Sequence, residues 1–380
     1  MRTWVKNGGI WTRIDNVGKK RQNLDMSPAQ DSIGPLSIEA EKLETAAVLR
    51  KEARVRQALA ELKGFAEVIP NQNILINAIV LKEAKESSAI ENIVTTQDEL
   101  YESMAVQSSN TDAAAKEVLS YREAVYTGCD LLRKRRLIGV SDILKIQETI
   151  VKNNAGIRRL PGTSLVNGST GEVIYTPPQD YDEICALLDD FCDHLNGTED
   201  SLWKMAMLHY QFEVIHPFYD GNGRTGRILN ILFLLLKGHL ETPILYLSSY
   251  IIKTKETYYG LLQEVRKNGA WEKWVLYILD GIEETAKETL GKVRSIKNLL
   301  DATLEEVREK LPKIYSKELV ETIFENPYSK TDFLVKKLNV NRKTAAKYFT
   351  ELENNGFLTH AQIGREKIFI HKKLMRILSE

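Results

Sequence analysis

The 380-residue sequence predicts a mainly α-helical protein with one β-hairpin in its middle and a small helix-and-hairpin domain at its C-terminal end. Three observations carry this prediction. Apolar side chains recur at helical spacing over most of the chain, as at Ile74, Ile76 and Ile79. Residues 164–178 break this pattern, because they are rich in Val, Ile, Tyr and Thr and contain Asn167-Gly168, which is typical of a hairpin. The length predicts two or three domains.

The N-terminal domain is predicted to cover residues 1–110. Residues 1–37 contain Gly8-Gly9, Pro28 and Pro35 with little periodicity, so we interpret them as a loosely structured arm. Helical patterns follow at 37–63 and at about 74–93. The core domain is predicted to cover 111–300, and its helical patterns lie at about 112–134, 140–152, 181–195, 200–214, 224–237, 254–267 and 270–310.

The C-terminal domain is predicted to cover residues 312–380. Three short helical patterns at 319–325, 332–338 and 342–354 precede two strand-like runs, 358–363 and 367–370. This order is typical of a winged helix. Arg342, Lys343 and Lys347 cluster near the start of the third helix, where a recognition helix meets the major groove of DNA. Dimer contacts or protein targets are the competing interpretation.

Composition excludes several classes of function. Lys plus Arg equals Asp plus Glu at 52 each, so the overall charge indicates no partner. Cys129, Cys185 and Cys192 form no CxxC pair, which favours a reducing cytoplasm over a disulfide framework. The densest apolar run, 228–236, has about half of the ~20 residues needed to span a bilayer. We therefore expect a cytoplasmic protein without a membrane partner.

The segment from His216 to Arg227 has the parts of a phosphate site. Three glycines let the backbone approach an oxyanion, and a helical pattern resumes directly after them, so helix N–H groups can face the anion. Arg224 and Arg227 can reach toward phosphate from the first helical turn. Asp220 offers a hard oxygen to Mg²⁺. His216 can take a proton near neutral pH.

Two other interpretations of this segment are disfavoured. Gly221, Gly223 and Gly226 have the spacing of a dinucleotide fingerprint, but that fingerprint follows a strand, whereas residues 202–214 are helical in pattern. A purely structural turn would not need two arginines, an aspartate and a histidine beside three glycines.

HPFYDGNGRTGR resembles the motif of the Fic family, usually written HPFx[D/E]GNGRxxR, at every fixed position. The resemblance implies a Fic-type helical core with the hairpin as a target-docking flap. It also implies transfer of AMP from ATP to a protein hydroxyl, with His216 as general base and Asp220 as ligand of Mg²⁺. It implies a nucleotide site made by Gly221, Asn222, Gly223, Arg224, Thr225, Gly226 and Arg227, with Tyr259 where relatives place adenine-pocket residues.

Residues 87–92, SSAIEN, match the inhibitory pattern [S/T]xxxE[G/N] of the same family. The resemblance implies an inhibitory helix at about 74–93, in which Ser87 opens the pattern and Glu91 pairs with Arg227. That pairing would keep Arg227 from the γ-phosphate of ATP.

The predicted function is therefore adenylylation of a Ser, Thr or Tyr side chain, on a target protein or on the chain itself. Two alternatives stay open. One is a DNA-binding regulator whose core senses nucleotide, and the other is removal of AMP from a modified protein. Neither the target nor a homodimer that would hold the inhibitory helix in place can be identified from these residues.

Overall fold

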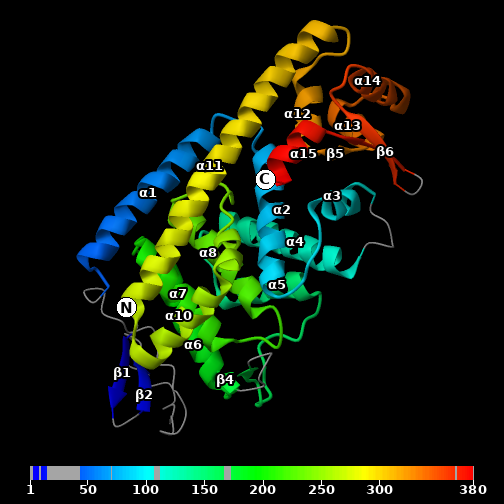
Figure 1. Ribbon diagram of the computed structural model, residues 1–380. Helices are drawn as coiled ribbons and strands as arrows, with labels where there is room; N and C mark the ends of the chain where they lie inside the picture. Colours follow the sequence, from blue (N-terminus) through cyan, green and yellow to red (C-terminus); the bar gives the residue numbers. More distant parts are fainter. Residues whose placement is uncertain are drawn as a thin grey trace.

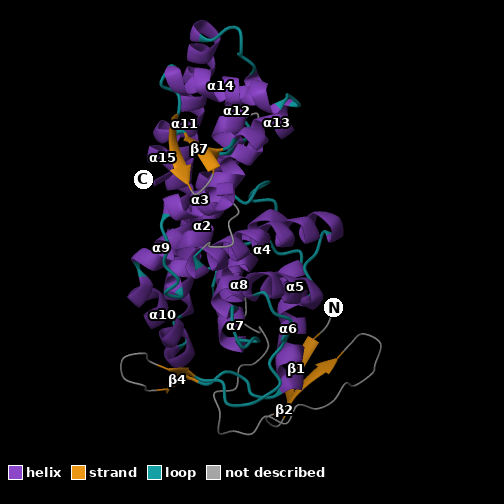
Figure 2. Ribbon diagram, turned by 90° about the vertical axis from the view of Figure 1, so that its right-hand side faces the viewer, coloured by secondary structure: helices purple, strands orange, loops and turns teal. Residues whose placement is uncertain are grey.

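The computed structural model describes residues 3–7, 10–14, 43–69, 71–106, 112–166, 173–363 and 366–379. It is mainly helical, as the sequence predicts (Figure 1). Figure 2 shows the same molecule turned by 90°, with only a few strands among the helices. Within these residues no helix is both long and apolar enough to cross a membrane.

The predicted helices of the N-terminal region and core are present with shifted ends, and the structure adds two short helices at 97–106 and 248–253. They are α1 (Ala46–Ala66), α2 (Gln72–Ile90), α3 (Gln97–Val106), α4 (Ala113–Arg135), α5 (Val140–Val151), α6 (Tyr181–Asn196), α7 (Leu202–Ile215), α8 (Asn222–Leu236), α9 (Ser248–Lys253), α10 (Lys255–Asn268) and α11 (Trp271–Lys310). The hairpin between α5 and α6 pairs β3 (Leu165–Val166) with β4 (Val173–Tyr175). The tip of the predicted hairpin, 167–172, lies outside the described residues.

The prediction of a loosely structured N-terminal arm is wrong for residues 3–7 and 10–14. Strands β1 (Thr3–Asn7) and β2 (Ile10–Ile14) pair antiparallel, with Thr3 opposite Ile14 and Asn7 opposite Ile10. The sequences TWVKN and IWTRI are rich in β-formers and are separated by two glycines, which is a hairpin pattern. Residues 15–42 lie outside the described part of the chain.

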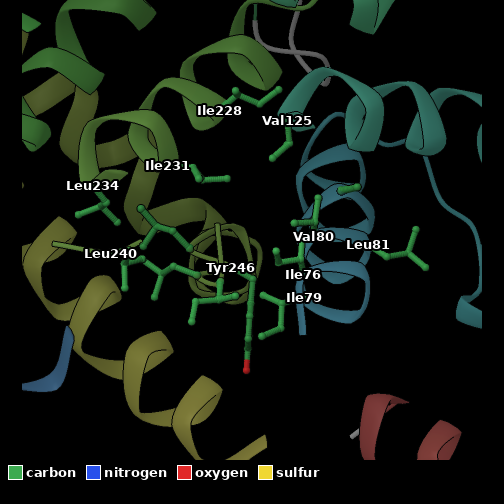
Figure 3. Close-up of a cluster of buried hydrophobic side chains, with 14 of the residues drawn as sticks. Ile76, Ile79, Val80, Leu81, Val125, Ile228, Ile231, Leu234, Leu240 and Tyr246 are labelled. Atoms are coloured by element: carbon green, nitrogen blue, oxygen red, sulfur yellow. The ribbon is translucent and has the colours of Figure 1, made fainter. Parts of the chain in front are cut away.

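A buried apolar cluster joins α2 to the helix that follows the glycine-rich loop. Helix α2 buries residues on most sides, so it is a core element rather than a surface helix. Figure 3 shows its contribution meeting that of α8 and the segment after it. The cluster includes Ile76, Ile79, Val80, Leu81, Val125, Ile228, Ile231, Leu234, Leu240 and Tyr246. Because both helices share this core, the C-terminal end of α2 is fixed beside the N-terminal end of α8.

The C-terminal domain has the element order of a winged helix. It contains α12 (Lys317–Glu325), β5 (Tyr328–Ser329), α13 (Thr331–Leu338), α14 (Arg342–Asn354), β6 (Thr359–Ile363) and β7 (Glu366–Ile370). The strands form one antiparallel sheet in the order β5-β7-β6. A last helix, α15 (Lys372–Ser379), was not predicted and lies against α11, which leads from the core to this domain (Figure 1).

Candidate active site

The glycine-rich loop between α7 and α8 turns twice through left-handed backbone conformations. His216 ends α7 with φ 48° and ψ 58°, and Gly221 precedes α8 with φ 81°. A side chain is rare at such a φ, so His216 is held in a strained conformation, as functional residues often are. Gly221 is required, since a Cβ there would lie 2.9 Å from Cγ1 of Val151.

Two polar side chains fix the shape of the loop. The Asn222 amide spans it, because its Oδ1 accepts from Phe218 N at 2.8 Å and its Nδ2 donates to Phe218 O at 2.8 Å. Asn222 was expected to cradle phosphate, but its side chain serves the loop and leaves only its backbone N–H for an anion. Buried Arg158 donates to the carbonyls of His216 at 2.8 Å and Ile215 at 3.3 Å. Its charge therefore lies at the negative C-terminal end of α7.

The His216 imidazole is unprotonated near neutral pH. Burial, opposed in part by the Glu213 carbonyl, lowers its pKa to about 4. Its Nδ1 lies 3.4 Å from that carbonyl oxygen. A neutral ring with a free nitrogen can accept a proton from a bound hydroxyl, which is what a general base requires.

The first turn of α8 offers an anion cradle. Thr225 N bonds to Gly221 O, so the N–H groups before it have no partner within the helix. They face outward with the positive end of the helix dipole. Gly223 lies directly beneath the ion pair at this point, because a Cβ there would lie 2.5 Å from Oε1 of Glu91 and 2.9 Å from Nη1 of Arg227.

The two arginines of the motif have different partners. Arg224 donates to Glu117 at 3.1 Å and to Asp220 at 3.3 Å. Arg227 donates through Nε to Ser87 Oγ at 2.7 Å and through Nη2 to Ser87 O at 3.0 Å and Glu91 Oε1 at 2.8 Å. Both arginines are buried, with 3% of each exposed. Arg227 thus has three contacts with the end of α2.

The ion pair between Glu91 and Arg227 is electrostatically strong. Burial acts to raise the pKa of Glu91, but attraction to Arg227 outweighs it and holds that pKa below its usual range. The same pair raises the pKa of Arg227 against its own burial. Both groups are therefore charged at neutral pH. Glu91 follows the last residue of α2, so the predicted inhibitory helix ends at Ile90 rather than at residue 93.

A cavity of about 800 Å³ gathers these groups. His216, Gly223, Arg227 and Glu91 line it from the motif and from α2. Leu165, Ile174 and Tyr175 line it from the hairpin. On α10, Tyr259 is 42% exposed and lines the cavity, while buried Tyr258 also bonds to His209 across 2.9 Å. A cavity of this size accommodates a nucleotide-sized ligand.

Some expected site residues lie beside the cavity rather than in its wall. Asp220, Arg224, Thr225 and Gly226 do not line it. Thr225 is fully buried, and a Cβ at Gly226 would lie 2.8 Å from Oε1 of Glu213. These two residues therefore support the packing of α8 against α7.

Sequence reasoning missed three groups that build the site. Arg158 holds the loop, Glu117 binds Arg224, and Lys255 donates to Ile90 O at 2.7 Å, at the end of α2. Each lies far from its partner in sequence, so no local pattern marks it.

The residues present fit a magnesium ion held by one carboxylate. Asp220 has a side chain that is 70% exposed, and its oxygens share only Arg224 and the neighbouring Gly221 N–H. Among the described residues no group of three or more His, Cys, Asp or Glu could hold a metal ion. An exposed carboxylate of this kind suits Mg²⁺, which keeps most of its waters and is commonly bound through one carboxylate and substrate phosphates.

Family models match three consecutive parts of the chain. Residues 49–130 match the N-terminal domain of the Fic/DOC family, and residues 137–234 match the Fic/DOC family domain itself. Residues 299–374 match the C-terminal domain of SoFic-like protein adenylyltransferases. The second match contains the whole loop, all of α7 and all but the last two residues of α8.

Curated relatives and solved structures agree with these matches. The chain is 25% identical over 214 residues to protein adenylyltransferase fic-1 of Caenorhabditis elegans, and this covers 53% of the chain and 40% of that protein. It is 30% identical over 190 residues to a probable protein adenylyltransferase of Aquifex aeolicus, covering 48% of the chain and 56% of that protein. The chain thus spans about two fifths to about half of these relatives.

The fold is shared with a Fic family protein from Desulfovibrio desulfuricans. The two structures superpose with a TM-score of 0.56 at 18% identity, over 89% of this chain and 98% of the other. A Fic-domain protein from Bacteroides thetaiotaomicron gives a TM-score of 0.50 at 19% identity, over 63% of this chain and 95% of the other.

Proposed function

We propose, from the premise that this chain is built of Fic/DOC-family domains, that it transfers AMP from ATP to a hydroxyl side chain of a protein and releases pyrophosphate. One observation carries the proposal. A neutral histidine, the open N-terminus of a helix and a buried arginine line one cavity, beneath a hairpin that borders it. A base and an anion cradle on one cavity are the two parts that nucleotidyl transfer needs.

In the proposed reaction, His216 removes the proton of the target hydroxyl. The oxygen attacks the α-phosphorus of ATP, and the bond from that phosphorus to the bridging oxygen breaks. Pyrophosphate leaves with the electron pair, while the proton stays on His216. The N–H groups at the start of α8 and the guanidinium groups of Arg224 and Arg227 stabilise the charge that develops on the phosphates. A magnesium ion at Asp220 would add positive charge beside the leaving group.

The target strand is proposed to dock on β3 and β4. Their short ladder borders the cavity, and an extended segment can add to the edge of such a hairpin. Tyr175 anchors β4 by donating to Val214 O at 2.7 Å, one turn from the catalytic loop. A hydroxyl presented by a docked strand would thus enter the cavity that contains His216.

Helix α2 is proposed to act as a brake on this reaction. Arg227 cannot hold a γ-phosphate while it binds Glu91 and Ser87. The Glu91 carboxylate also lies over Gly223, at the mouth of the anion cradle. ATP would therefore bind without its phosphates aligned, until Glu91 moves away.

The test is intact-protein mass spectrometry of wild type, Glu91→Gly and His216→Ala after incubation with ATP and Mg²⁺, alone and with cell lysate as the source of targets. AMP labelling should rise about tenfold or more in Glu91→Gly, because the variant removes a charge-assisted contact. In the Glu91→Gly background, His216→Ala should lower labelling by about 100-fold or more. Both variants should still bind ATP. Equal labelling of His216→Ala would remove the proposed base, and equal labelling of Glu91→Gly would remove the brake.

A second function, DNA binding, is favoured by the surface of α14. Arg342, Lys343 and Lys347 are exposed near the start of this helix, and Arg342 reaches Asp332 at 3.3 Å. Asn341 caps the helix by accepting from Thr344 N at 2.9 Å. Duplex binding that weakens with salt and is lost in Lys343→Ala/Lys347→Ala, but survives in His216→Ala, would establish this function.

A further inference from the structure

A second cavity lies on the opposite side of α2 from Arg227, where α2 meets α9, α11 and α15. It has a volume of about 600 Å³ and shares no lining residue with the active-site cavity. Figure 1 shows α15 (red) beside α2 and the long α11 at this junction. A cavity of this volume is in the range that small-molecule ligands occupy.

The wall of this cavity carries an excess of unpaired positive charge. Its lysines are Lys82 and Lys85 of α2, Lys253 of α9 and Lys292 of α11. Only Lys253 has a carboxylate partner, Glu288 at 2.9 Å with Glu284 at 3.7 Å. Among the described residues, the other three lysines have no carboxylate within ion-pair distance. One acid in the wall, Glu86, is left to offset them.

Lys82 is held partly out of water. Its Nζ lies 4.8 Å from the centre of the Tyr246 ring, a favourable cation–π contact with a ring that enters the core beside α2 (Figure 3). Burial, and after it the positive charge of Lys292, lowers the pKa of Lys82 to about 8, although Glu86 and Glu288 act to raise it. Two ammonium groups this close to each other reduce stability unless an anion binds beside them. Residues that destabilise a fold in this way are typical of binding sites.

The remaining wall suits an oxyanion. Lys292 donates to Ile377 O at 3.3 Å, but a carbonyl does not neutralise its charge. Ser249, Ser295 and Gln97 add neutral hydrogen-bonding groups. Gly291 lies inside the 40-residue α11, where glycine is less favourable than alanine, and a Cβ there would enter open space. The glycine thus leaves room in the cavity at a cost to the helix.

We propose that this cavity binds a soluble small molecule that carries two or more phosphate groups, held by Lys82, Lys85 and Lys292. Lysine binds phosphate as a point charge, and three lysines around one cavity match several phosphate charges rather than one. The site is separate from AMP transfer, because no residue of the His216 cavity takes part in it.

The test is calorimetric titration of the full chain with inorganic triphosphate, in the presence of EDTA. Wild type should bind, and Lys82→Met/Lys292→Met should bind about tenfold more weakly or worse, because two charge-assisted contacts are lost. Gly291→Leu should also lose binding, since its side chain fills the cavity, while the helix becomes more stable. Lys287→Met is the matched control, because Lys287 lies on the same helix, pairs with Glu283 and does not line the cavity.

Two further measurements distinguish binding in this cavity from binding of triphosphate at Arg227. If triphosphate binds in this cavity, Arg227→Ala should still bind it. If Arg227→Ala no longer binds triphosphate while Lys82→Met/Lys292→Met still does, the proposal is overturned. Thermal unfolding without ligand should show Lys292→Met to be at least as stable as wild type, with no upward shift in Tm on adding triphosphate. Lys292→Arg keeps the charge and should keep the shift. Equal Tm shifts in wild type and Lys292→Met would also overturn the proposal.

The affinity should fall as pH rises from about 7.5 to about 9, through the pKa of Lys82. Lys82 is charged below its pKa of about 8, and the groups facing it are Lys292, Glu86 and Glu288, with Lys253 paired to Glu288. Above that pKa the lysine must take up a proton to bind the anion, so binding weakens. Lys287→Met should follow the wild-type curve, and an affinity that does not change over this range in either protein would contradict a role for Lys82.

Discussion

The buried carboxyl group of Glu83 shows how single residues of α2 set the properties of the site. Glu83 accepts from Ser248 N at 3.1 Å and from Tyr121 Oη at 3.1 Å, and it also bonds to Ser248 Oγ. Burial raises its pKa to about 7, against these hydrogen bonds and the attraction of Arg227. The carboxyl is therefore partly protonated near neutral pH.

Glu83→Gln should stabilise the protein more at pH 8 than at pH 5. A carboxyl whose pKa is raised in the folded protein stabilises the fold fully only at pH values below its pKa in the unfolded chain, 4.5. This stabilisation is lost as the pH rises to the folded-state pKa of about 7. The glutamine has no charge to bury. The difference in unfolding free energy between Glu83→Gln and wild type should therefore grow by up to about 3 kcal/mol from pH 5 to pH 8. Urea unfolding at the two pH values measures the gap. The exposed Glu305→Gln serves as control, and a gap that shrinks toward pH 8 would contradict the ionisation of a buried Glu83.

At the scale of single residues, the motif could be recognised from the sequence, because its chemistry lies within twelve consecutive positions. The residues that surround the motif could not be predicted. Asn222 was expected to face phosphate, yet its amide closes the loop, which depends on the turn that Gly221 permits. Arg158 reaches the same loop from 58 residues away in sequence. Such contacts follow from tertiary packing, and no local spacing encodes them.

At the scale of elements, α2 is held at its C-terminal end by several separate contacts. Ser87 Oγ accepts from Arg227, the Ile90 carbonyl accepts from Lys255, and Glu83 binds the start of α9. Together with Glu91, these contacts anchor the end of α2. We therefore expect removal of any single contact to weaken the proposed brake only in part.

Ser87→Ala should raise AMP labelling above wild type, but less than Glu91→Gly does. It removes one contact of Arg227 Nε and leaves the Glu91 ion pair and the Ser87 carbonyl in place. A neutral–charged hydrogen bond of about 1.5–3 kcal/mol corresponds to roughly 10- to 150-fold. Because Arg227 keeps its other partners, only part of this should appear, as a rise of roughly tenfold at most. Labelling rates of the two single variants and the double variant measure this. Ser88→Ala is the matched control, since no contact between Ser88 and Arg227 is present. Labelling of Ser87→Ala below wild type would show that Ser87 serves catalysis instead.

The long periodic helices could be predicted as elements, with ends displaced by a few residues. Three short helices, α3, α9 and α15, could not, because none has a periodic run long enough to stand out. Helix α9 has only six residues, and its place depends on Glu83 binding Ser248. The end of α2 at Ile90 could not be predicted from the sequence either. It coincides with a left-handed backbone conformation at Asn92, which asparagine tolerates but does not require.

At the scale of the whole molecule, α12 and β5 of the C-terminal domain rest on the N-terminal half of α2 and on α3. Tyr328 of β5 donates to Asp98 Oδ1 at 2.7 Å and stacks on Tyr101, with ring centres 5.8 Å apart. Asn77 of α2 donates to the Glu325 carbonyl at 3.3 Å. These contacts touch α2 far from Glu91, whereas the shared core with α8 and the anchors around Arg227 hold its other end (Figure 3).

Tyr328→Ala should therefore loosen the C-terminal domain without releasing the brake. Truncation of a buried aromatic side chain costs about 3 kcal/mol, enough to weaken the docking of residues 317–379. The contacts of Arg227 with Ser87 and Glu91 do not pass through Tyr328, so labelling should stay within about twofold of wild type, a change worth less than about 1 kcal/mol. Hydrogen exchange reports the docking and mass spectrometry reports the labelling, with Tyr328→Phe keeping the ring stack as control. A rise in labelling that matches Glu91→Gly would instead mean that the C-terminal domain controls α2, and that a partner bound to that domain could switch the enzyme on.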